Sequence, residues 1–412
     1  MARRQRLGLP RRRGTADVTP LWPLPDDPIV GEVVSASRDL GLARRYQELD
    51  RKPEFPVAEF RALGRAGLLG LSLPSSMGGR QLPLPRVAVA LFHLGYLGGT
   101  TFAKLAIQPE FASVLGEHGS PTAVDRWFRP LVRGERLVGN QITEPAAGSD
   151  VGAIALEAQR DGEGYVLTGS KSEIAFAEDA DAAIVYGRVP PPVDGRGITA
   201  FLVEQDLPGV RRSVGTGDLG ERWQRRGRVD YDRVKIPGSA RIGEEGSALR
   251  YVRSELARER GFLAAIYLGV ARASWDETVA YVRDRVAFGH PLSEAQAVAF
   301  PLVHDGASLE SAWLYTLHAL ERLEAADSAD AAAATAVAKA MASDVALRTI
   351  DHAIQFHGGR GYSQALPHEQ RWRDVRSGPI AHGPSEVLYG VAARRLWPRK
   401  PPPATLNPSS EP

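Results

Sequence analysis

The sequence predicts a mainly α-helical fold with a β domain between two helical regions. Hydrophobic residues follow a helical period over about residues 41–133, and short β-rich runs separated by turn residues replace that pattern over about 138–243. From about residue 247 the helical period returns in long stretches with short connections. This order lacks the strand–helix alternation of a doubly wound sheet, so we expect a helical domain, an antiparallel β domain and a helical bundle.

The two ends of the chain differ in composition from the rest. The first 35 residues open on the basic stretch MARRQRLGLPRRRG and continue into the proline-rich TPLWPLPDDPIVGE, and residues 398–412 are again rich in proline. We expect a disordered leader over 1–35 and a disordered tail over 398–412. A transit peptide is the alternative for the basic start, although Pro10 interrupts it.

The domain boundaries follow from these changes in pattern. We place the N-terminal helical domain at 36–137, the middle β domain at 138–246 and the helical bundle at 247–397. In the middle domain the expected strands are GYVLTGS, AAIVYGRV, GITAFLVEQ and GRVDYDRVKIPG, with turns such as DGEG and DLPG between them. In the bundle a first helix carries LARERGFLAAIYLGV, a second follows Ser293, and an alanine-rich third ends at Gly358.

The composition excludes several classes of protein. The chain has no cysteine, which rules out disulfides, thiolate metal sites and cysteine nucleophiles and is compatible with a reducing cytoplasm. It contains no apolar run of the roughly 20 residues that a membrane-spanning helix needs. Its net charge is +2, with acids interspersed among the basic residues beyond the leader, so no stripe for nucleic acid is evident. We therefore expect a cytoplasmic protein that binds neither nucleic acid nor membrane.

Three common functional motifs are weak or missing in the sequence. The segment GTGDLG, residues 215–220, matches the dinucleotide pattern GxGxxG, but the ERWQRRGRVDYDRV that follows has no apolar helical face. A loop of the β domain is therefore favoured over a Rossmann turn. The nine histidines form no HExxH pair and no carboxylate cluster at ligand spacing, and no GxSxG elbow occurs, so we expect no metal site.

The segment TEPAAGSD, residues 143–150, is a candidate ligand-binding loop. Its small residues at 146–148 allow backbone N–H groups to approach a ligand, and Thr143 and Ser149 add hydroxyl donors. Such a loop suits a phosphate or the edge of a flavin. A simple tight turn is the alternative.

Glu259 lies on the apolar side of the first bundle helix. Its neighbours at helical spacing are Leu256, Leu263 and Ile266, with Val270 one turn beyond. A carboxylate in such a place loses water, which raises its pKa and suits it to proton abstraction. The alternatives are an ion pair with an arginine from another segment or a slightly rotated helix.

His382 stands in the crowded turn GPIAHGPSEVLYG, residues 378–390. A Gly-Pro-Ser-Glu sequence of this kind positions a side chain or a backbone group. The histidine is a candidate catalytic base, or a structural group bonded within the turn.

Together these segments resemble the acyl-CoA dehydrogenase family. The resemblance runs from about Phe55 to Trp397 through ordered motifs, among them GLLGLSLPSSMGG, QITEPAAGSD, YVLTGSK, LARERG, YVRDRVAFGHPL, QFHGGRGY, RWRDVR and HGPSEV. It implies an N-terminal α domain, a middle β-barrel and a C-terminal four-helix bundle, assembled as tetramers or dimers. It also implies bound FAD, an acyl thioester substrate on CoA or an acyl carrier protein, and a flavin electron-acceptor protein as partner.

The resemblance assigns roles to individual residues. Ser149 and Arg260 would contact the substrate. In a neighbouring subunit, Arg285, Phe288 and Gln296 would contact FAD, while Gln355 and the two glycines after His357 would lie along its phosphates. The positions expected around FAD are Gln141, Ile142, Thr143, Gly148, Ser149, Glu173, Ala175, Arg285, Phe288, Gln296, Gln355, Gly358, Gly359, Pro384 and Glu386.

The catalytic base is the point at which family members differ. In most members of the family that this chain resembles, the glutamate stands at the position of His382. In those similar to isovaleryl-CoA dehydrogenase it belongs to an ER pair on the first bundle helix. ARERG puts Glu259 in that place, so we expect Glu259 to remove the α proton. The backbone N–H of His382 would then hold the thioester carbonyl, a role that does not depend on the side chain.

Three departures from the family pattern concern the flavin surroundings. EIA stands where the family has WIT, so Glu173 replaces a tryptophan beside the ring and Ala175 a flavin-contacting threonine; Pro384 replaces another threonine. An extra carboxylate there should disfavour the anionic reduced flavin. Two alternatives to a dehydrogenase stay open: a flavin-dependent monooxygenase on the same fold, and a degenerate, non-catalytic homologue.

Overall fold

The N-terminal region is helical from residue 28 onward in the computed structural model, which describes residues 26–190, 197–326 and 328–397. Helix α1 begins at Pro28, and the Asp27 side chain accepts a hydrogen bond from the N–H of Ile29, a typical N-cap. The expectation of a disordered leader up to residue 35 is therefore wrong for 28–35. The rest of that leader to residue 25, and the tail 398–412, lie outside the described residues.

The N-terminal domain is a set of short helices around one long, buried helix, α4. Helix α4 is almost completely buried over its central turns. Its helical geometry is interrupted at Gly99, which has a positive φ and, because it lacks a Cβ atom, leaves room for the ring of Tyr46. The helices are α1 (Pro28–Asp39), α2 (Leu42–Arg51), α3 (Val57–Arg65), α4 (Leu84–Ala106), α5 (Ser113–His118), α6 (Pro121–Ala123) and α7 (Arg129–Val132).

The middle domain is an eight-stranded sheet. Its strands run in the order β6-β7-β3-β2-β4-β5-β8, and β1 also pairs with β4, in parallel. The path ends at β6 and β8, which do not pair with each other in the described residues, so the hydrogen bonds do not close the expected barrel. The strands are β1 (Val138–Gln141), β2 (Glu157–Asp161), β3 (Gly164–Ile174), β4 (Ala182–Arg188), β5 (Ile198–Glu204), β6 (Val210–Val214), β7 (Gly227–Pro237) and β8 (Arg241–Ile242).

The segment GTGDLG lies in the connection between β6 and β7, as expected for a loop of this domain. It opens no α-helix: a short 3₁₀ turn, Arg222–Gln224, follows it. The Rossmann interpretation is therefore excluded by the local structure.

The C-terminal domain is built from three long helices and two shorter ones. Helix α8 is joined to α9 by a small hairpin, and α12 packs against α10. The elements are α8 (Ala248–Asp284), β9 (Val286–Ala287), β10 (His290–Pro291), α9 (Gln296–Ala325), α10 (Ala329–His357), α11 (His368–Val375) and α12 (Ser385–Leu396). None of the described helices is long and apolar enough to cross a membrane.

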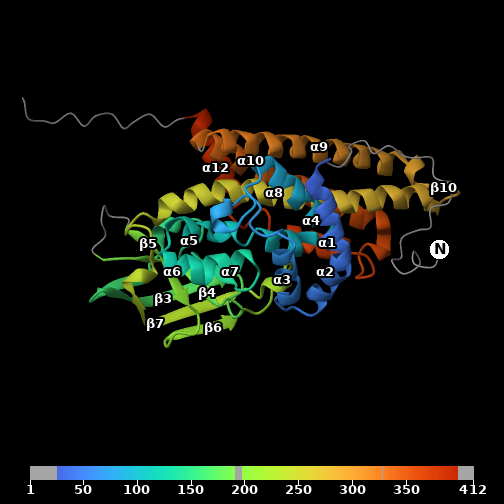
Figure 1. The fold of residues 1–412 in the computed structure, drawn as a ribbon. Coiled ribbons are helices and arrows are strands. Elements are labelled where there is room, and N and C mark those ends of the chain that lie inside the picture. The colour runs from blue at the N-terminus through green and yellow to red at the C-terminus, as the bar shows by residue number, and fades with distance from the viewer. Residues whose placement is uncertain (1–25, 191–196, 327, 398–412) are drawn as a thin grey trace, which may run out of the picture.

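The three domains share one core, with α4 and α8 at its centre. Figure 1 shows α8, α9 and α10 side by side, with the sheet below one end of them and α1 to α3 farther along. Helices α4 and α8 approach closely because Gly95 faces the carbonyl of Ile266 and Gly269 faces that of Phe92, where a Cβ atom would lie 2.6 Å and 2.0 Å from oxygen. This contact fixes α8, and with it Glu259, against the N-terminal domain.

Candidate active site

Glu259 is buried on α8, with 4 % of its surface exposed. Leu263, Ile266 and Val270, the apolar neighbours expected from the helical spacing, are fully buried beside it. Burial raises the pKa of its carboxyl well above the ordinary value, and the negative charge of Glu255 adds to the rise. No lysine or arginine forms an ion pair with Glu259 in the part of the chain that the structure describes; the imidazole of His382 approaches its carboxyl instead.

His382 faces Glu259 directly. Its Nε2 atom lies 3.6 Å from Oε2 of Glu259, and its ring stacks on Phe111 with 5.1 Å between ring centres. Burial, together with the charges of Lys104, Lys339 and Arg260, lowers its pKa to about 3, although 28 % of the side chain remains exposed. The imidazole is therefore neutral at pH 7, so it forms no ion pair with Glu259.

The backbone of the His382 turn is held by two cations. Arg260 Nε donates to the carbonyl of His382 at 3.1 Å, and Lys339 Nζ donates to that of Gly383 at 2.9 Å. His382 has a left-handed backbone conformation, with φ of +55°. Its N–H makes no hydrogen bond to any described residue, so the turn whose side chain approaches Glu259 also carries an unused backbone donor.

A buried ion pair holds the loop 143–150 in place. Lys171 on β3 is fully buried and donates from Nζ to Oε1 of Glu144 at 2.8 Å and to the carbonyl of Ile142 at 2.9 Å. Glu144 also accepts the N–H groups of Ala155 and Leu156. Because Glu144 points inward, Gly148 and Ser149 at the end of the loop remain exposed, as a ligand-binding loop requires.

The side chain of Gln141 does not face a ligand site. It is 1 % exposed, donates to Gln205 at 3.0 Å and accepts from the Tyr231 hydroxyl at 2.7 Å inside the sheet. Because its side-chain amide is bonded inside the sheet, Gln141 could contact FAD only through its backbone. Thr143 is half-buried, and its carbonyl accepts the N–H of Ser172 from β3.

The two positions where EIA replaces WIT lie at the end of the same strand, Glu173 within β3 and Ala175 directly after it. Glu173, with φ of +56°, leaves 66 % of its side chain exposed and lies 3.6 Å from Arg226. Ala175 is half-buried. Since Ser172 bonds to Thr143, both positions lie next to the loop, and Arg226 offsets part of the carboxylate charge.

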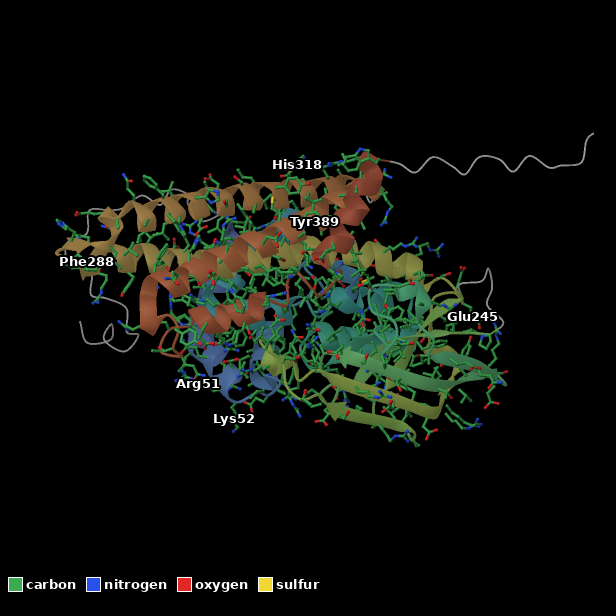
Figure 2. The ribbon with its side chains drawn as sticks, turned by 180° about the vertical axis from the view of Figure 1, so that it is seen from behind. Arg51, Lys52, Glu245, Phe288, His318 and Tyr389 are labelled. Carbon is green, nitrogen blue, oxygen red and sulfur yellow. The ribbon has the colours of Figure 1, made fainter. Side chains whose placement is uncertain are left out.

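The remaining predicted cofactor contacts lie far from this site within one chain. Arg285, Phe288 and Gln296 surround the hairpin at the far end of α8, and Gln355, Gly358 and Gly359 lie at the end of α10, where Tyr281 stacks on His357. From Glu259 to Arg285 the helix rises about 39 Å at 1.5 Å per residue. Figure 2 shows Phe288 projecting from one end of the molecule and Glu245, near the start of α8, at the other.

These far residues are open to a second molecule. Phe288 is fully exposed, Arg285 and Gln296 are exposed, and a Cβ atom on Gly358 or Gly359 would meet nothing within 4 Å. Near Glu259, the exposed loop 143–150 is held by the buried Lys171–Glu144 ion pair. At the far end of α8, Arg285 is exposed and the backbone of Gly358 and Gly359 is accessible. Both sets suit a flavin dinucleotide that extends from one chain to a neighbour, so the residues present fit FAD.

Comparison with known proteins decides the family. Models of the acyl-CoA dehydrogenase N-terminal, middle and C-terminal domains match residues 34–135, 139–234 and 246–397. The chain belongs to the acyl-CoA dehydrogenase family. The predicted family and its fold are thereby confirmed, and with them the prediction of an FAD-dependent oxidoreductase that acts on CH–CH groups.

Individual relatives cover nearly the whole chain. It is 32 % identical to cyclohex-1-ene-1-carbonyl-CoA dehydrogenase of Geobacter metallireducens. The alignment spans 357 residues, 86 % of this chain and 93 % of the relative. The butyryl-CoA dehydrogenase of Megasphaera elsdenii superposes with a TM-score of 0.83 at 27 % identity, covering 91 % and 100 %. The FAD complex of PigA gives 0.82 at 25 % identity, covering 90 % and 98 %.

Several residues of the site were missed in the sequence. Phe111 stacks on His382, Lys339 holds Gly383, and Glu110 and Glu255 influence Glu259. Two of these left a signal: Lys339 is an isolated charge in an alanine-rich helix, and Glu255 precedes Glu259 by one turn on the same face. Phe111 and Glu110 left none, because their position depends on how the 3₁₀ turn Glu110–Ala112 packs against α8.

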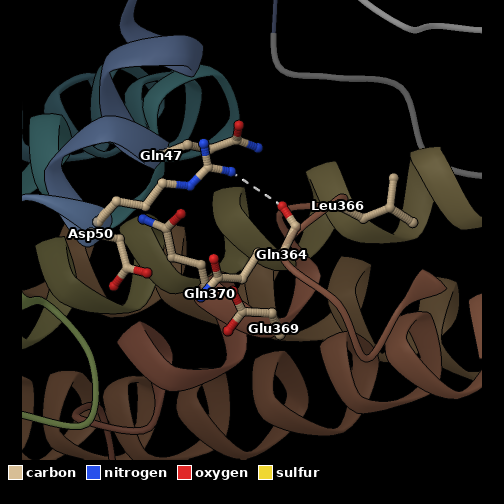
Figure 3. Close-up of a pocket in the computed structure, with 7 residues that line it drawn as sticks. Gln47, Asp50, Gln364, Leu366, Glu369 and Gln370 are labelled. Carbon is tan, nitrogen blue, oxygen red and sulfur yellow. Dashed lines mark hydrogen bonds between the residues drawn. The ribbon is translucent and has the colours of Figure 1, made fainter. Parts of the chain in front are cut away.

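A small surface pocket elsewhere belongs to the domain packing. It lies between α2 and the start of α11, lined by Asp50, Gln364 and Glu369, and Arg51 donates across it to the Gln364 carbonyl at 3.3 Å (Figure 3). Asp50 is already paired with Arg373 at 2.6 Å. The pocket is therefore closed by its own polar contacts and is separate from Glu259.

Proposed function

We propose that this protein oxidises the α,β bond of an acyl thioester, with Glu259 as the base. The single observation that supports this most strongly is the pairing of a buried, cation-free carboxylate with the free N–H of the His382 turn. In the butyryl-CoA and cyclohex-1-ene-1-carbonyl-CoA relatives the named substrates are CoA thioesters. The acyl group that this chain oxidises is carried by CoA or by an acyl carrier protein.

The residues divide the work at the substrate. The N–H of His382 donates to the thioester carbonyl, whose oxygen gains negative charge as the α proton leaves. Glu259 accepts that proton at a carboxylate oxygen, and desolvation makes the carboxylate a stronger base than one in water. Arg260 and Lys339 hold the turn so that donor and base keep their separation.

Bound FAD supplies the acceptor for the hydrogen that leaves the β carbon. Loop 143–150, with Ile142, Thr143, Gly148 and Ser149, would flank the flavin, together with Glu173, Ala175, Pro384 and Glu386. Pro384 begins α12 directly after the His382 turn, and Glu386 is exposed in its first turn. Ser149 and Arg260 would contact the thioester end.

We also propose a homo-oligomer, a tetramer or dimer, in which Arg285, Phe288 and Gln296 complete the FAD site of the neighbouring subunit. The distance along α8 supports this, because these residues cannot reach the flavin of their own chain. Gln355, Gly358 and Gly359 would lie along the phosphates there. A cytoplasmic location and an electron-acceptor flavoprotein as partner complete the proposal.

The experiment is anaerobic addition of a panel of acyl-CoA thioesters to the purified, FAD-loaded protein. Bleaching of the flavin with formation of an enoyl thioester is the expected result. Rapid oxygen consumption by supplied reduced flavin, without enoyl product, would instead establish the monooxygenase. A protein that cannot take up FAD would be the non-catalytic homologue.

A further inference from the structure

Three carboxyl groups gather around the His382 turn. Glu255 and Glu259 are one turn apart on α8, and Glu110 directly precedes Phe111, whose ring stacks on His382. All three are at most 5 % exposed. The charges of Glu255 and Glu110 both raise the pKa of Glu259, so the three carboxyls are close enough to influence one another.

Hydrogen bonds satisfy this carboxyl cluster only in part. Glu110 Oε1 accepts from the N–H and the hydroxyl of Ser72, both at 3.2 Å, whereas its buried Oε2 has no partner. Glu255 Oε1 accepts from the N–H of Val114 at 2.7 Å and the hydroxyl of Ser113 at 3.0 Å. Two adjacent acids thus use one oxygen each for the protein scaffold.

The carboxyl cluster has positive charge near it but few direct ion pairs. Within the described part of the chain, neither Glu110 nor Glu255 forms an ion pair with lysine or arginine. The charge of Arg258 lowers the pKa of all three carboxyls, but its Nη2 atom donates to Ser113 at 2.8 Å and lies 3.8 Å from Glu117 rather than bonding to the cluster. One arginine that bonds elsewhere compensates three buried carboxyls only in part, and a hydrocarbon chain placed beside them would not reduce the remaining cost.

Burial raises the pKa of both Glu110 and Glu255 to about 7, so each is partly ionised at neutral pH and an added positive charge would complete its ionisation. A ligand ammonium group would donate to the free Oε2 of Glu110 and pair with the cluster. It would thereby supply the donor that Glu110 Oε2 lacks and a positive charge bonded directly to the cluster.

We propose that the acyl group carries a protonated amine, which Glu110 and Glu255 bind while Glu259 acts on the α carbon. This inference rests on the proposed function and names its substrate class: amino-substituted acyl thioesters in place of plain hydrocarbon ones. Glu110 and Glu255 are then the residues that determine specificity.

The test compares acyl groups of the same shape that differ only in charge. Cyclohexanecarbonyl-CoA and piperidine-4-carbonyl-CoA form one pair, cyclopentanecarbonyl-CoA and pyrrolidine-2-carbonyl-CoA a second, and each is added anaerobically to the FAD-loaded wild-type protein. We expect at least one amine to reduce the flavin at least about tenfold more efficiently, as rate constant over dissociation constant, than its carbocyclic partner. Equal or better reduction by both carbocycles would overturn the proposal and leave the dehydrogenase function intact.

Variants then locate the preference. Glu110→Gln keeps the size of the side chain and should lower the ratio of reduction by the amine to reduction by the carbocycle about tenfold; Glu255→Gln serves as a second variant if Glu110→Gln fails to fold. Glu157→Gln, an exposed acid on β2, is the control. A preference unchanged in Glu110→Gln and Glu255→Gln would overturn the assignment of these residues. If none of the four thioesters, nor any in the wider panel, bleaches bound flavin, the proposed function fails as well.

Discussion

The Nε2 atom of His382 lies 3.6 Å from a carboxylate oxygen of Glu259, although Glu259 belongs to helix α8 and His382 to the turn before α12, 123 positions later in the chain. The histidine is neutral, since burial lowers its pKa to about 3, and the glutamate is desolvated, which raises its pKa. Because the imidazole carries no extra proton, it cannot protonate the Glu259 carboxylate, which stays available to take a proton from carbon. This arrangement supports our proposal that Glu259 takes the proton and that His382 contributes its backbone donor.

Lys339 links the stability of the protein to pH. Its burial, with the charges of Arg260 and Lys104, lowers its pKa from 10.5 to about 7. Between those values the unfolded chain holds a proton that the folded chain has lost, so the free energy of unfolding rises with pH from about 7 to 10.5, and below about 7, where both states are protonated, this group adds no pH dependence. Relative to Lys339→Met, the wild type should gain up to about 1.4 kcal/mol per pH unit between pH 7 and 10. Urea unfolding at several pH values measures the difference, and parallel curves for the two proteins would contradict the assignment.

Glu144→Gln should destabilise the loop that carries the expected flavin contacts. The change leaves Lys171 buried without its counter-charge, because the 2.8 Å pair is its ion-pair contact within the described residues. We expect a loss of about 3 kcal/mol in the free energy of unfolding and release of bound FAD on gel filtration.

The matched control for Glu144→Gln is Asp161→Asn in the same sheet. It breaks an exposed pair with Lys235, whose side chains are 53 % and 76 % exposed, and should cost less than about 0.5 kcal/mol. Equal losses in the two variants would show that burial of the Lys171 pair has no special effect.

Arg285→Ala and Phe288→Ala should release FAD without unfolding the chain. Both side chains are exposed at the hairpin after α8, so their removal opens no cavity. We expect weaker FAD retention with an unchanged melting temperature of the apoprotein, and Arg44→Ala, with 80 % exposure on α2, as an inert control.

A mixture of subunits tests whether the hairpin acts on a neighbour. Glu259→Gln subunits have an intact hairpin, and Arg285→Ala subunits have an intact base, so reassembled mixtures should recover activity that neither variant shows alone. No recovery in mixed oligomers, verified by their subunit ratio, would place the hairpin contacts in the same chain.

Much of the architecture could be predicted from the sequence, because periodic hydrophobicity is a local property. The helical spacing around Glu259 indicated its burial, and the β-rich runs indicated the sheet. The start of the first helix was placed too late because the proline-rich composition before Val30 hid a capped helix start at Asp27 and Pro28. Proline at the first helical position is compatible with a helix, so composition alone was misleading there.

The contacts between segments could not be predicted in the same way. Gln141 belongs to a family motif beside FAD, yet its side chain bonds inside the sheet to Gln205 and Tyr231, partners that the pairing of strands brings together. Glu110 depends on the packing of a 3₁₀ turn against α8. Such placements follow from tertiary packing, to which local pattern is blind.

The most direct test of the account is the reductive half-reaction of Glu259→Gln beside that of His382→Ala, both loaded with FAD and mixed anaerobically with a thioester that bleaches the wild type. Loss of the base should slow bleaching by roughly 10²–10⁴-fold, while loss of the imidazole should leave much of it, because the donor at position 382 is backbone. Circular dichroism and the flavin content of both variants show that they are folded and loaded. Fast bleaching in Glu259→Gln together with its loss in His382→Ala would contradict the account and make the histidine the base.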